Sequence, residues 1–118
     1  METVNQAAHR RFVRRNPLYA TWRGMLQRCE NPAARGYEYY GGQGIKVYPR
    51  WHNYKSFERW IFRNIGRRPA GCTLDRIDNW GDYEPGNVRW ATASEQRRNR
   101  RPAWTSWPEN RERRWLYE

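Results

Sequence analysis

The stretch over residues 73–100 constrains the fold more than any other part of the chain. Residues 73–78 (TLDRID) and residues 87–91 (NVRWA) are each predicted to form a short β-strand. Residues 79–86 (NWGDYEPG), which lie between them, are rich in turn-forming residues. We therefore predict that the two strands pair as a hairpin with a loop at its end.

A helix is predicted directly after the second strand. The sequence TASE matches a capping box, in which the Thr92 hydroxyl and the Glu95 carboxylate satisfy backbone N–H groups at a helix start. We expect this helix to run from Ala93 to about Arg100 and to end before Pro102, which cannot continue a helix. The result is a strand–loop–strand–helix unit.

Two further helices and a short strand are predicted upstream. Asn16 and Pro17 are typical of a helix start, with Asn16 as the N-cap. The apolar side chains that follow fall on one helical face: Leu18, Trp22, Met25, Leu26 and Cys29. Residues 45–48 predict a short strand, and Asn53 or Ser56 can cap a second helix.

Charge predicts the class of partner. The formal net charge is +11, and the 23 basic side chains are all arginines except Lys46 and Lys55. Arginine pairs bidentately with phosphate and stacks on bases, so this composition favours nucleic acid. Aromatic residues make up 16% of the chain and supply apolar surface for a small core.

Length and composition predict a single α+β domain. We place it at residues 16–101, after a flexible basic arm at residues 1–15 and before a Trp- and Arg-rich tail at residues 102–118. No apolar run approaches the roughly 20 residues of a membrane span, and the first residues lack a hydrophobic signal core. We expect no membrane partner, a cytoplasmic location, and Cys29 and Cys72 as buried thiols.

The strand–loop–strand–helix unit resembles the HNH, or His-Me finger, nuclease family, especially the short homing-endonuclease-like proteins of bacteriophages. The residues that carry the resemblance are 74–79 (LDRIDN), Gly81, 87–92 (NVRWAT), Glu95 with Gln96, and Asn99. Residues 16–32 and 39–51 are also similar to those phage proteins, so the likeness covers most of residues 16–101. It implies an HNH-like ββα finger, double-stranded DNA as the partner, and the cytoplasm of a bacterial host if the gene is carried by a phage.

The resemblance also implies roles for individual residues around one divalent metal, Mg²⁺ or Mn²⁺. Asp75 would bind the metal, Asn87 would hold the loop backbone, and Gln96, or Asn99 one helical turn later, would complete the metal site. Arg76 stands where the family usually has a histidine that deprotonates the attacking water. Because arginine cannot accept a proton at neutral pH, its implied role is to clamp a phosphate oxygen or stabilise charge in the transition state.

The residues themselves leave the role of the acidic side chains open. Asp75 and Asp78 could bind metal, or they could form salt bridges with Arg76 and Arg89 that fix the hairpin. Two functions therefore compete. The first is a metal-dependent DNA endonuclease, and the second is a catalytically silent HNH-like module that binds DNA as a regulator or accessory of a phage complex. RNA binding is disfavoured by the resemblance.

The predicted DNA-binding face lies on the second strand and the last helix. Its residues are Arg89, Arg97, Arg98, Arg100 and Arg101. In the family the corresponding helix lies against the DNA backbone, so we expect these arginines to contact phosphates rather than to read bases.

Overall fold

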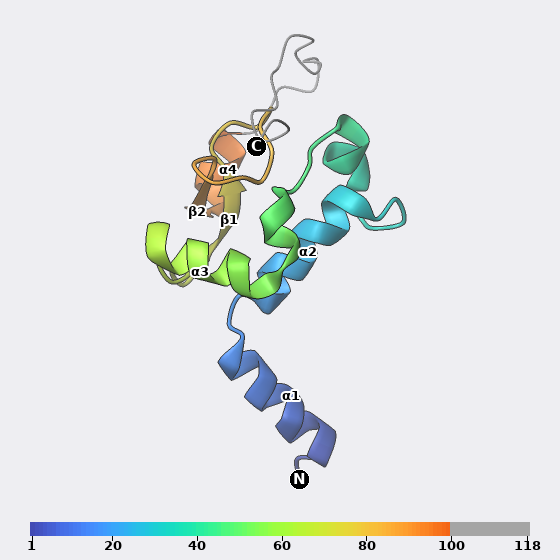
Figure 1. The fold of residues 1–118 in the computed structure, drawn as a ribbon, viewed down its shortest axis with the longest axis vertical. Helices are drawn as coiled ribbons and strands as arrows, with labels where there is room; N and C mark the ends of the chain where they lie inside the picture. Colours follow the sequence, from blue (N-terminus) through green and yellow to red (C-terminus); the bar gives the residue numbers. More distant parts are fainter. Residues whose placement is uncertain (100–118) are drawn as a thin grey trace.

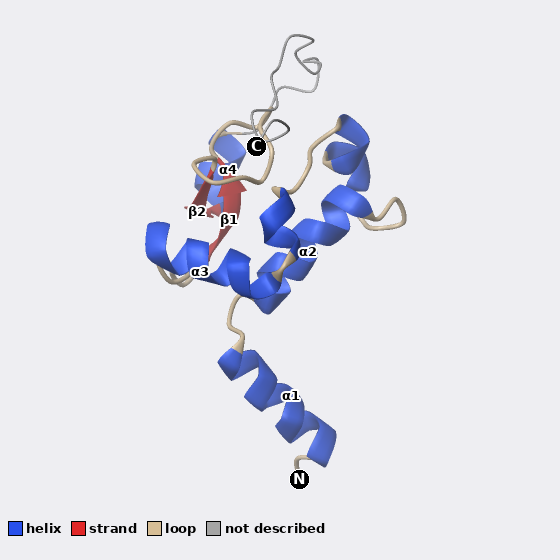
Figure 2. Cartoon of the chain, viewed as in Figure 1, coloured by secondary structure: helices blue, strands red, loops and turns tan. Residues whose placement is uncertain are grey.

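A computed structural model describes residues 1–99 (Figure 1). Its α-helices are α1 (Val4–Arg15), α2 (Tyr19–Glu30), α3 (Tyr54–Asn64) and α4 (Ala93–Arg98). The strands β1 (Cys72–Arg76) and β2 (Val88–Thr92) and the short 3₁₀ helices η1 (Tyr37–Tyr39), η2 (Gly41–Gln43) and η3 (Pro49–His52) complete the described elements (Figure 2). The predicted α+β class is confirmed.

The two strands pair antiparallel, as predicted from the hairpin pattern. Leu74 lies opposite Trp90, and Asp75 lies opposite Arg89. Side chains alternate across a strand, so Leu74 and Arg76 are buried against the helices while Asp75 is on the other face. α4 covers that second face and begins at the predicted capping box, where Thr92 Oγ1 accepts from the Glu95 N–H.

The core forms where α2 and α3 meet, and its largest fully buried side chains are aromatic: Trp51, Tyr83 and Phe57. Trp51 is 1% exposed, and its ring contacts those of Phe57 and Trp60, each at a centroid distance of 5.3 Å. Such ring pairs contribute about 0.5–1.5 kcal/mol each beyond the burial of their area. From α2, Met25 and Cys29 are buried, which confirms the predicted apolar face of this helix.

The start of α2 differs from the prediction. Asn16 ends α1 instead of capping α2, and its side-chain Nδ2 donates to the Phe12 carbonyl at 3.0 Å. Leu18 is the N-cap of α2, and its side chain makes no capping hydrogen bond. The backbone N–H of Leu18 instead donates to the Tyr54 hydroxyl on α3 at 3.1 Å. The same hydroxyl donates to Glu58 Oε2 at 2.6 Å. A tertiary hydrogen bond to Tyr54 therefore stands at the start of α2, in place of the local cap predicted from Asn16.

The N-terminal segment is a helix, where we expected an arm with little order. Thr3 and Gln6 form a capping box at the start of α1, but none of the α1 residues is buried. The helix projects from the rest of the described chain (Figure 1). Phe12 packs edge-on against Tyr19 at a centroid distance of 4.9 Å.

Residues 45–48 were predicted to form a strand, and this prediction is wrong. Only Val47 pairs, through an isolated parallel bridge to Tyr83. The Tyr48 N–H donates to the Tyr83 carbonyl at 2.8 Å, and the Tyr83 N–H donates to the Lys46 carbonyl at 3.0 Å. The bridge fastens the loop between β1 and β2 to the helical part. Within residues 1–99 no helix combines the length and the apolar character needed to span a bilayer.

Candidate functional site

The loop between β1 and β2 is held in shape by Asn87, which is 9% exposed. Its Oδ1 accepts from the Asp78 N–H at 2.8 Å, and its Nδ2 donates to the carbonyls of Asp82 at 2.9 Å and Asp78 at 3.2 Å. Gly81 packs so closely that a Cβ there would lie 2.2 Å from Asn87 Nδ2. The structure thus places Asn87 where the resemblance implies a loop-holding residue.

Arg76, the last residue of β1, also holds this loop in place. It is 5% exposed, and its Nη1 donates to the carbonyls of Asn79 at 2.7 Å and Gly81 at 2.8 Å. Its guanidinium lies over the rings of Tyr40 and Tyr83, at 5.1 and 5.5 Å from their centroids. Its Nη1 is therefore engaged by the loop, and the phosphate contact implied for Arg76 stays a prediction.

Sequence reasoning missed the residues that surround Arg76. Tyr40 and Tyr83 stack with their centroids 6.3 Å apart, and Arg28 also lies over Tyr40, at 5.2 Å from its centroid. Arg28 Nη2 donates to the Tyr83 hydroxyl at 3.3 Å. Asp82 is 0% exposed, and its Oδ1 accepts from a backbone N–H of the η2–η3 connection. No local spacing links these positions, so only the tertiary fold could reveal them.

Asp75 forms the hairpin salt bridge that the sequence left open as an alternative to metal binding. Arg89 Nε donates to Asp75 Oδ2 at 3.1 Å, and the two side chains are 37% and 13% exposed. Asp78 is used differently, because its Oδ1 accepts from the Trp80 N–H at 2.9 Å and so shapes the loop.

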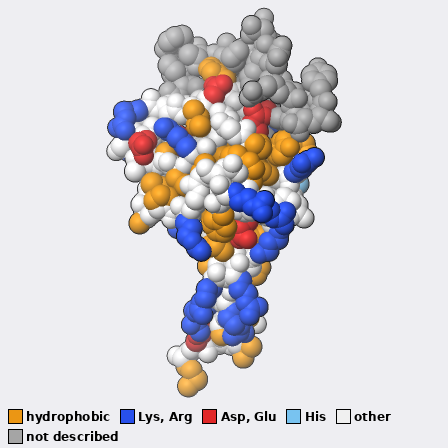
Figure 3. Space-filling view, turned by 60° about the vertical axis from the view of Figure 1, so that its left-hand side comes forward, with side chains coloured by type: hydrophobic (Ala, Val, Ile, Leu, Met, Phe, Trp, Pro, Cys, Tyr) orange, Lys and Arg blue, Asp and Glu red, His pale blue; other side chains and the backbone are white. Residues whose placement is uncertain are grey.

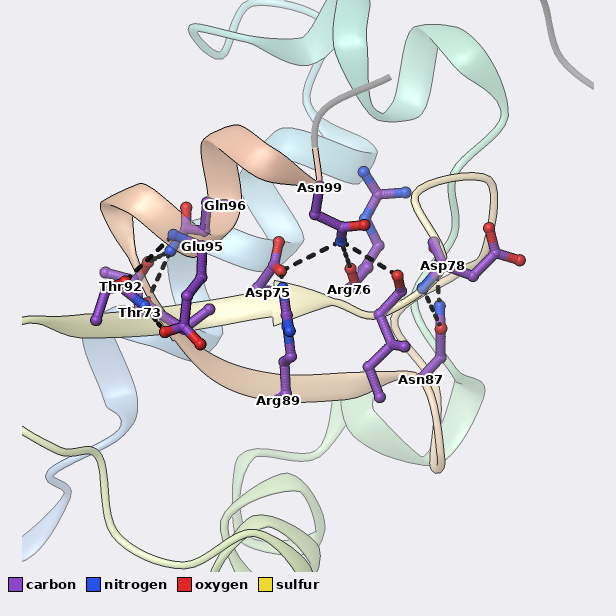
Figure 4. A network of polar contacts seen from close by, with 12 residues as sticks. Thr73, Asp75, Arg76, Asp78, Asn87, Arg89, Thr92, Glu95, Gln96 and Asn99 are labelled. Carbon is purple, nitrogen blue, oxygen red and sulfur yellow. Dashed lines mark hydrogen bonds and ion pairs between the residues drawn. The ribbon is translucent and has the colours of Figure 1, made fainter. Parts of the chain in front are cut away.

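Side-chain amides of α4 fasten it to β1 (Figure 4). Asn99 Nδ2 donates to the carbonyls of Arg76 at 2.8 Å and Ile77 at 3.1 Å, and it lies 3.4 Å from Asp75 Oδ2. Gln96 Nε2 donates to Thr73 Oγ1 and to a β2 carbonyl. Of the two amides predicted as metal ligands, Asn99 therefore lies beside Asp75, while Gln96 contacts an earlier residue of β1.

The oxygens around Asn99 Nδ2 are of the kind that a hard divalent cation takes. They are one carboxylate oxygen, from Asp75, and the carbonyl oxygens of Arg76 and Ile77. In residues 1–99 there is no cluster of three or more His, Cys, Asp or Glu that could hold a metal. The donor set fits such a cation in chemical kind, with Asp75 as its anionic member. To bind it, Arg89 would have to release Asp75, and Asn99 would have to turn its Oδ1 toward the cation in place of Nδ2.

Arginines on α4 and β2 form the described part of the predicted DNA-binding face. Arg97 and Arg98 are exposed in the last turn of the helix, and Arg89 is partly exposed on the neighbouring strand. The N–H of Thr92 donates to Glu95, and this bond holds the pKa of Glu95 below its ordinary value. The other two predicted contacts, Arg100 and Arg101, lie outside the described residues.

A second group of polar side chains lies apart from Asp75, at the end of α2. His52 Nε2 is 2.5 Å from Glu30 Oε1, and its Nδ1 is 2.9 Å from the Pro49 carbonyl. Both partners are acceptors, so the geometry suits a doubly protonated ring. A cavity of about 330 Å³ is lined by Cys29, Glu30, Lys46, Val47, Pro49 and His52. Burial raises the pKa of the Cys29 thiol to about 12, which keeps it protonated.

No protein-family model, curated protein or solved structure was found to match this chain.

Proposed function

We propose that this chain binds double-stranded DNA through β1, β2 and α4, acting as an HNH-like ββα finger. The observation that carries the proposal is the pair of exposed arginines, Arg97 and Arg98, on a helix whose start is fixed by a capping box. A helix anchored to β1 by Asn99 presents these cations in a set direction, which suits phosphates spaced along a duplex. The formal net charge of +11 supports the same partner.

A salt titration with duplex DNA tests this proposal. Each neutralised phosphate contributes about 0.9 to the slope of log affinity against log salt, so we expect a magnitude of about 4 or more for the wild type. Replacing Arg97 and Arg98 with Gln should reduce the slope by about 2, equally for different sequences. Arg59→Gln with Arg63→Gln, two exposed positions on α3, is the matched control and should have a smaller effect. A slope near zero for the wild type would exclude a nucleic-acid partner.

We propose divalent-metal-dependent DNA cleavage as a second function, on a separate observation. The Asp75 carboxylate, two backbone carbonyls and the Asn99 amide converge at one point between β1 and α4. Asp75 and Asn99 would hold Mg²⁺ or Mn²⁺, which when bound would polarise a phosphate and stabilise charge on it. Asn87 and Arg76 would keep the loop next to that point in a fixed shape.

Conversion of supercoiled plasmid to nicked or linear DNA tests the second function. With Mg²⁺ or Mn²⁺ the wild type should cleave, and Asp75→Asn should abolish cleavage while DNA binding is kept. Glu38→Gln removes the same charge at an exposed site in η1 and should cleave like the wild type. Folded wild-type protein that binds DNA but cleaves with neither metal would leave the catalytically silent module as the function.

A further inference from the structure

We propose that α1 is a second DNA-contacting element, which lies along the phosphate backbone of the duplex beyond the part bound by α4. This inference rests on the proposed DNA binding and adds a contact surface that the finger does not include. The surface, which we term the arginine face, consists of Arg10, Arg11, Arg14 and Arg15, all exposed. Figure 3 shows Lys and Arg side chains along the projecting α1 and more of them on the body above it.

The arginine face is a directional surface. Successive helical residues are rotated by about 100°, so the four arginines fall within an arc of about 140°. Ala7 lies in the same arc one turn earlier and leaves room for close approach. Phe12 lies outside the arc and packs on Tyr19, so the contact that joins α1 to the body leaves the arginine face open.

On its own, α1 has little to stabilise it as a helix. No α1 residue is buried, and a helix of this length is marginal in water without packing. Arg10 with Arg14, and Arg11 with Arg15, are like charges four residues apart, and each such pair costs roughly 0.2–0.5 kcal/mol. A row of phosphates would neutralise these charges and would therefore stabilise the helix as well as bind it.

The dimensions of α1 fit a duplex backbone. From Arg10 to Arg15 the helix rises about 7–8 Å, at about 1.5 Å per residue. One DNA strand carries a charge about every 3.4 Å along the axis, so this length spans about two or three phosphates. Because contacts between arginine and phosphate carry no sequence information, the added affinity should be independent of sequence.

Glu2 forms an ion pair with one member of the arginine face, Arg10. Its carboxylate accepts two bonds from Arg10, from Nε at 3.0 Å and from Nη2 at 2.9 Å, and both side chains are largely exposed. In the free protein this pair neutralises one member of the arginine face. Removing the carboxylate should make Arg10 available to phosphate and so increase DNA affinity.

The main test compares two triple variants in duplex-binding salt titrations. Arg11→Gln, Arg14→Gln and Arg15→Gln together should lower affinity at least tenfold at about 0.1 M salt and reduce the slope by about 2–3. The matched control removes three exposed arginines of the body, Arg35, Arg59 and Arg63, and should lower affinity by less than half as much on a logarithmic scale. Both triples should keep the wild-type melting temperature, because none of these side chains is buried.

Two further measurements keep the inference falsifiable. Glu2→Gln should raise duplex affinity severalfold, whereas Glu38→Gln, with the same charge change at η1, should raise it less. Amide hydrogen exchange in residues 4–15 should slow when duplex DNA is added. Equal effects of the two triples on duplex affinity, or unchanged amide exchange in α1, would overturn the role of α1. The Arg97 and Arg98 variants test DNA binding by the finger independently of this result. If the wild type forms dimers without DNA and the α1 triple does not, the partner of α1 is a second copy of the chain, and the proposal is overturned.

Discussion

Asp75 and Arg89 face each other across the β1–β2 ladder, with Arg89 Nε 3.1 Å from Asp75 Oδ2. The pair joins a proposed metal ligand to a predicted DNA contact, so the salt bridge between them competes with both roles. In the free protein the guanidinium holds the carboxylate, and the carboxylate keeps the guanidinium on the sheet. Binding of phosphate by Arg89 would release Asp75, and a cation on Asp75 would release Arg89.

This competition predicts the effect of Asp75→Asn on binding. Loss of the carboxylate charge frees Arg89, so duplex affinity at moderate salt should rise about two- to fivefold, by roughly 0.4–1 kcal/mol. Fluorescence anisotropy with a labelled duplex measures this change. Glu38→Gln controls for net charge and should give a smaller increase, and in the background of Arg89→Gln the effect of Asp75→Asn should shrink to that of the control. A decrease in affinity would contradict the competition.

Arg76 is predicted to be a structural residue. Arg76→Leu leaves the half-buried carbonyl of Asn79 and the buried carbonyl of Gly81 without their donor, at a cost of about 2–4 kcal/mol in the free energy of unfolding. Denaturant unfolding measures this value, and Arg63→Leu at an exposed position should change it by about 0.5 kcal/mol or less.

A related variant separates this role from catalysis. Arg76→His introduces the residue type that the nuclease family usually has there, but the side chain would enter the buried face of β1, opposite to Asp75. We expect lower stability and no gain in plasmid cleavage. Increased cleavage by Arg76→His would show that position 76 can reach the Asp75 face after all.

Local features of the fold were predictable because the atoms that determine them are close in sequence. The capping box at Thr92 and the cap of α3 by Asn53 each involve residues three apart, and both are confirmed. Asn16 was assigned to the wrong helix because its position suits either the end of one helix or the start of the next. The presence of α1 before Asn16 decides between these two positions. This helix carries no apolar face by which the sequence could have predicted it.

The arrangement of the candidate site was predictable only in part. The strand pattern places Asp75 and Arg89 on neighbouring strands, and the pairing register makes them opposite. The inward direction of Arg76 depends on the rings of Tyr40 and Tyr83, whose positions follow from tertiary packing. For the same reason the spacing on α4 could not decide which amide would lie beside Asp75.

Gly81 should be intolerant of any side chain. In Gly81→Ala the new Cβ would meet Asn87 Nδ2 at 2.2 Å, so the buried amide would have to leave its carbonyl partners. We expect a loss of about 2–4 kcal/mol in the free energy of unfolding, measured by chemical denaturation. Gly66→Ala is the control, since its Cβ meets nothing within 4 Å and only its φ of +79° is unfavourable, at about 1–2 kcal/mol. Equal losses would mean that the contact with Asn87 is not tight.

The His52–Glu30 pair predicts a pH dependence of stability. Partial burial lowers the pKa of His52, but the hydrogen bonds to Glu30 and to the Pro49 carbonyl outweigh it, and the net shift is upward from 6.5. A raised pKa in the folded state means that the stabilisation is complete below pH 6.5 and is lost as the pH rises through the folded-state value. The melting temperature should therefore fall more between about pH 6 and pH 8.5 for the wild type than for His52→Gln.

Two variants check the origin of that pH dependence. Glu30→Gln should flatten the profile as His52→Gln does, because it removes the charged acceptor. His9→Gln alters the other histidine, which is exposed on α1, and should keep the wild-type profile. A profile that flattens only with His9→Gln would assign the titration to α1 instead.

The hydroxyl of Tyr54 has a consequence for how the molecule folds. It accepts from the first free N–H of α2 and donates to Glu58 of α3, so the beginning of one helix is completed by a side chain of another. Neither helix can fray there without breaking the bond that serves both. α2 and α3 are thus expected to open and close as one cooperative unit, and a peptide spanning α2 alone should lack the helicity that the segment has in the intact chain.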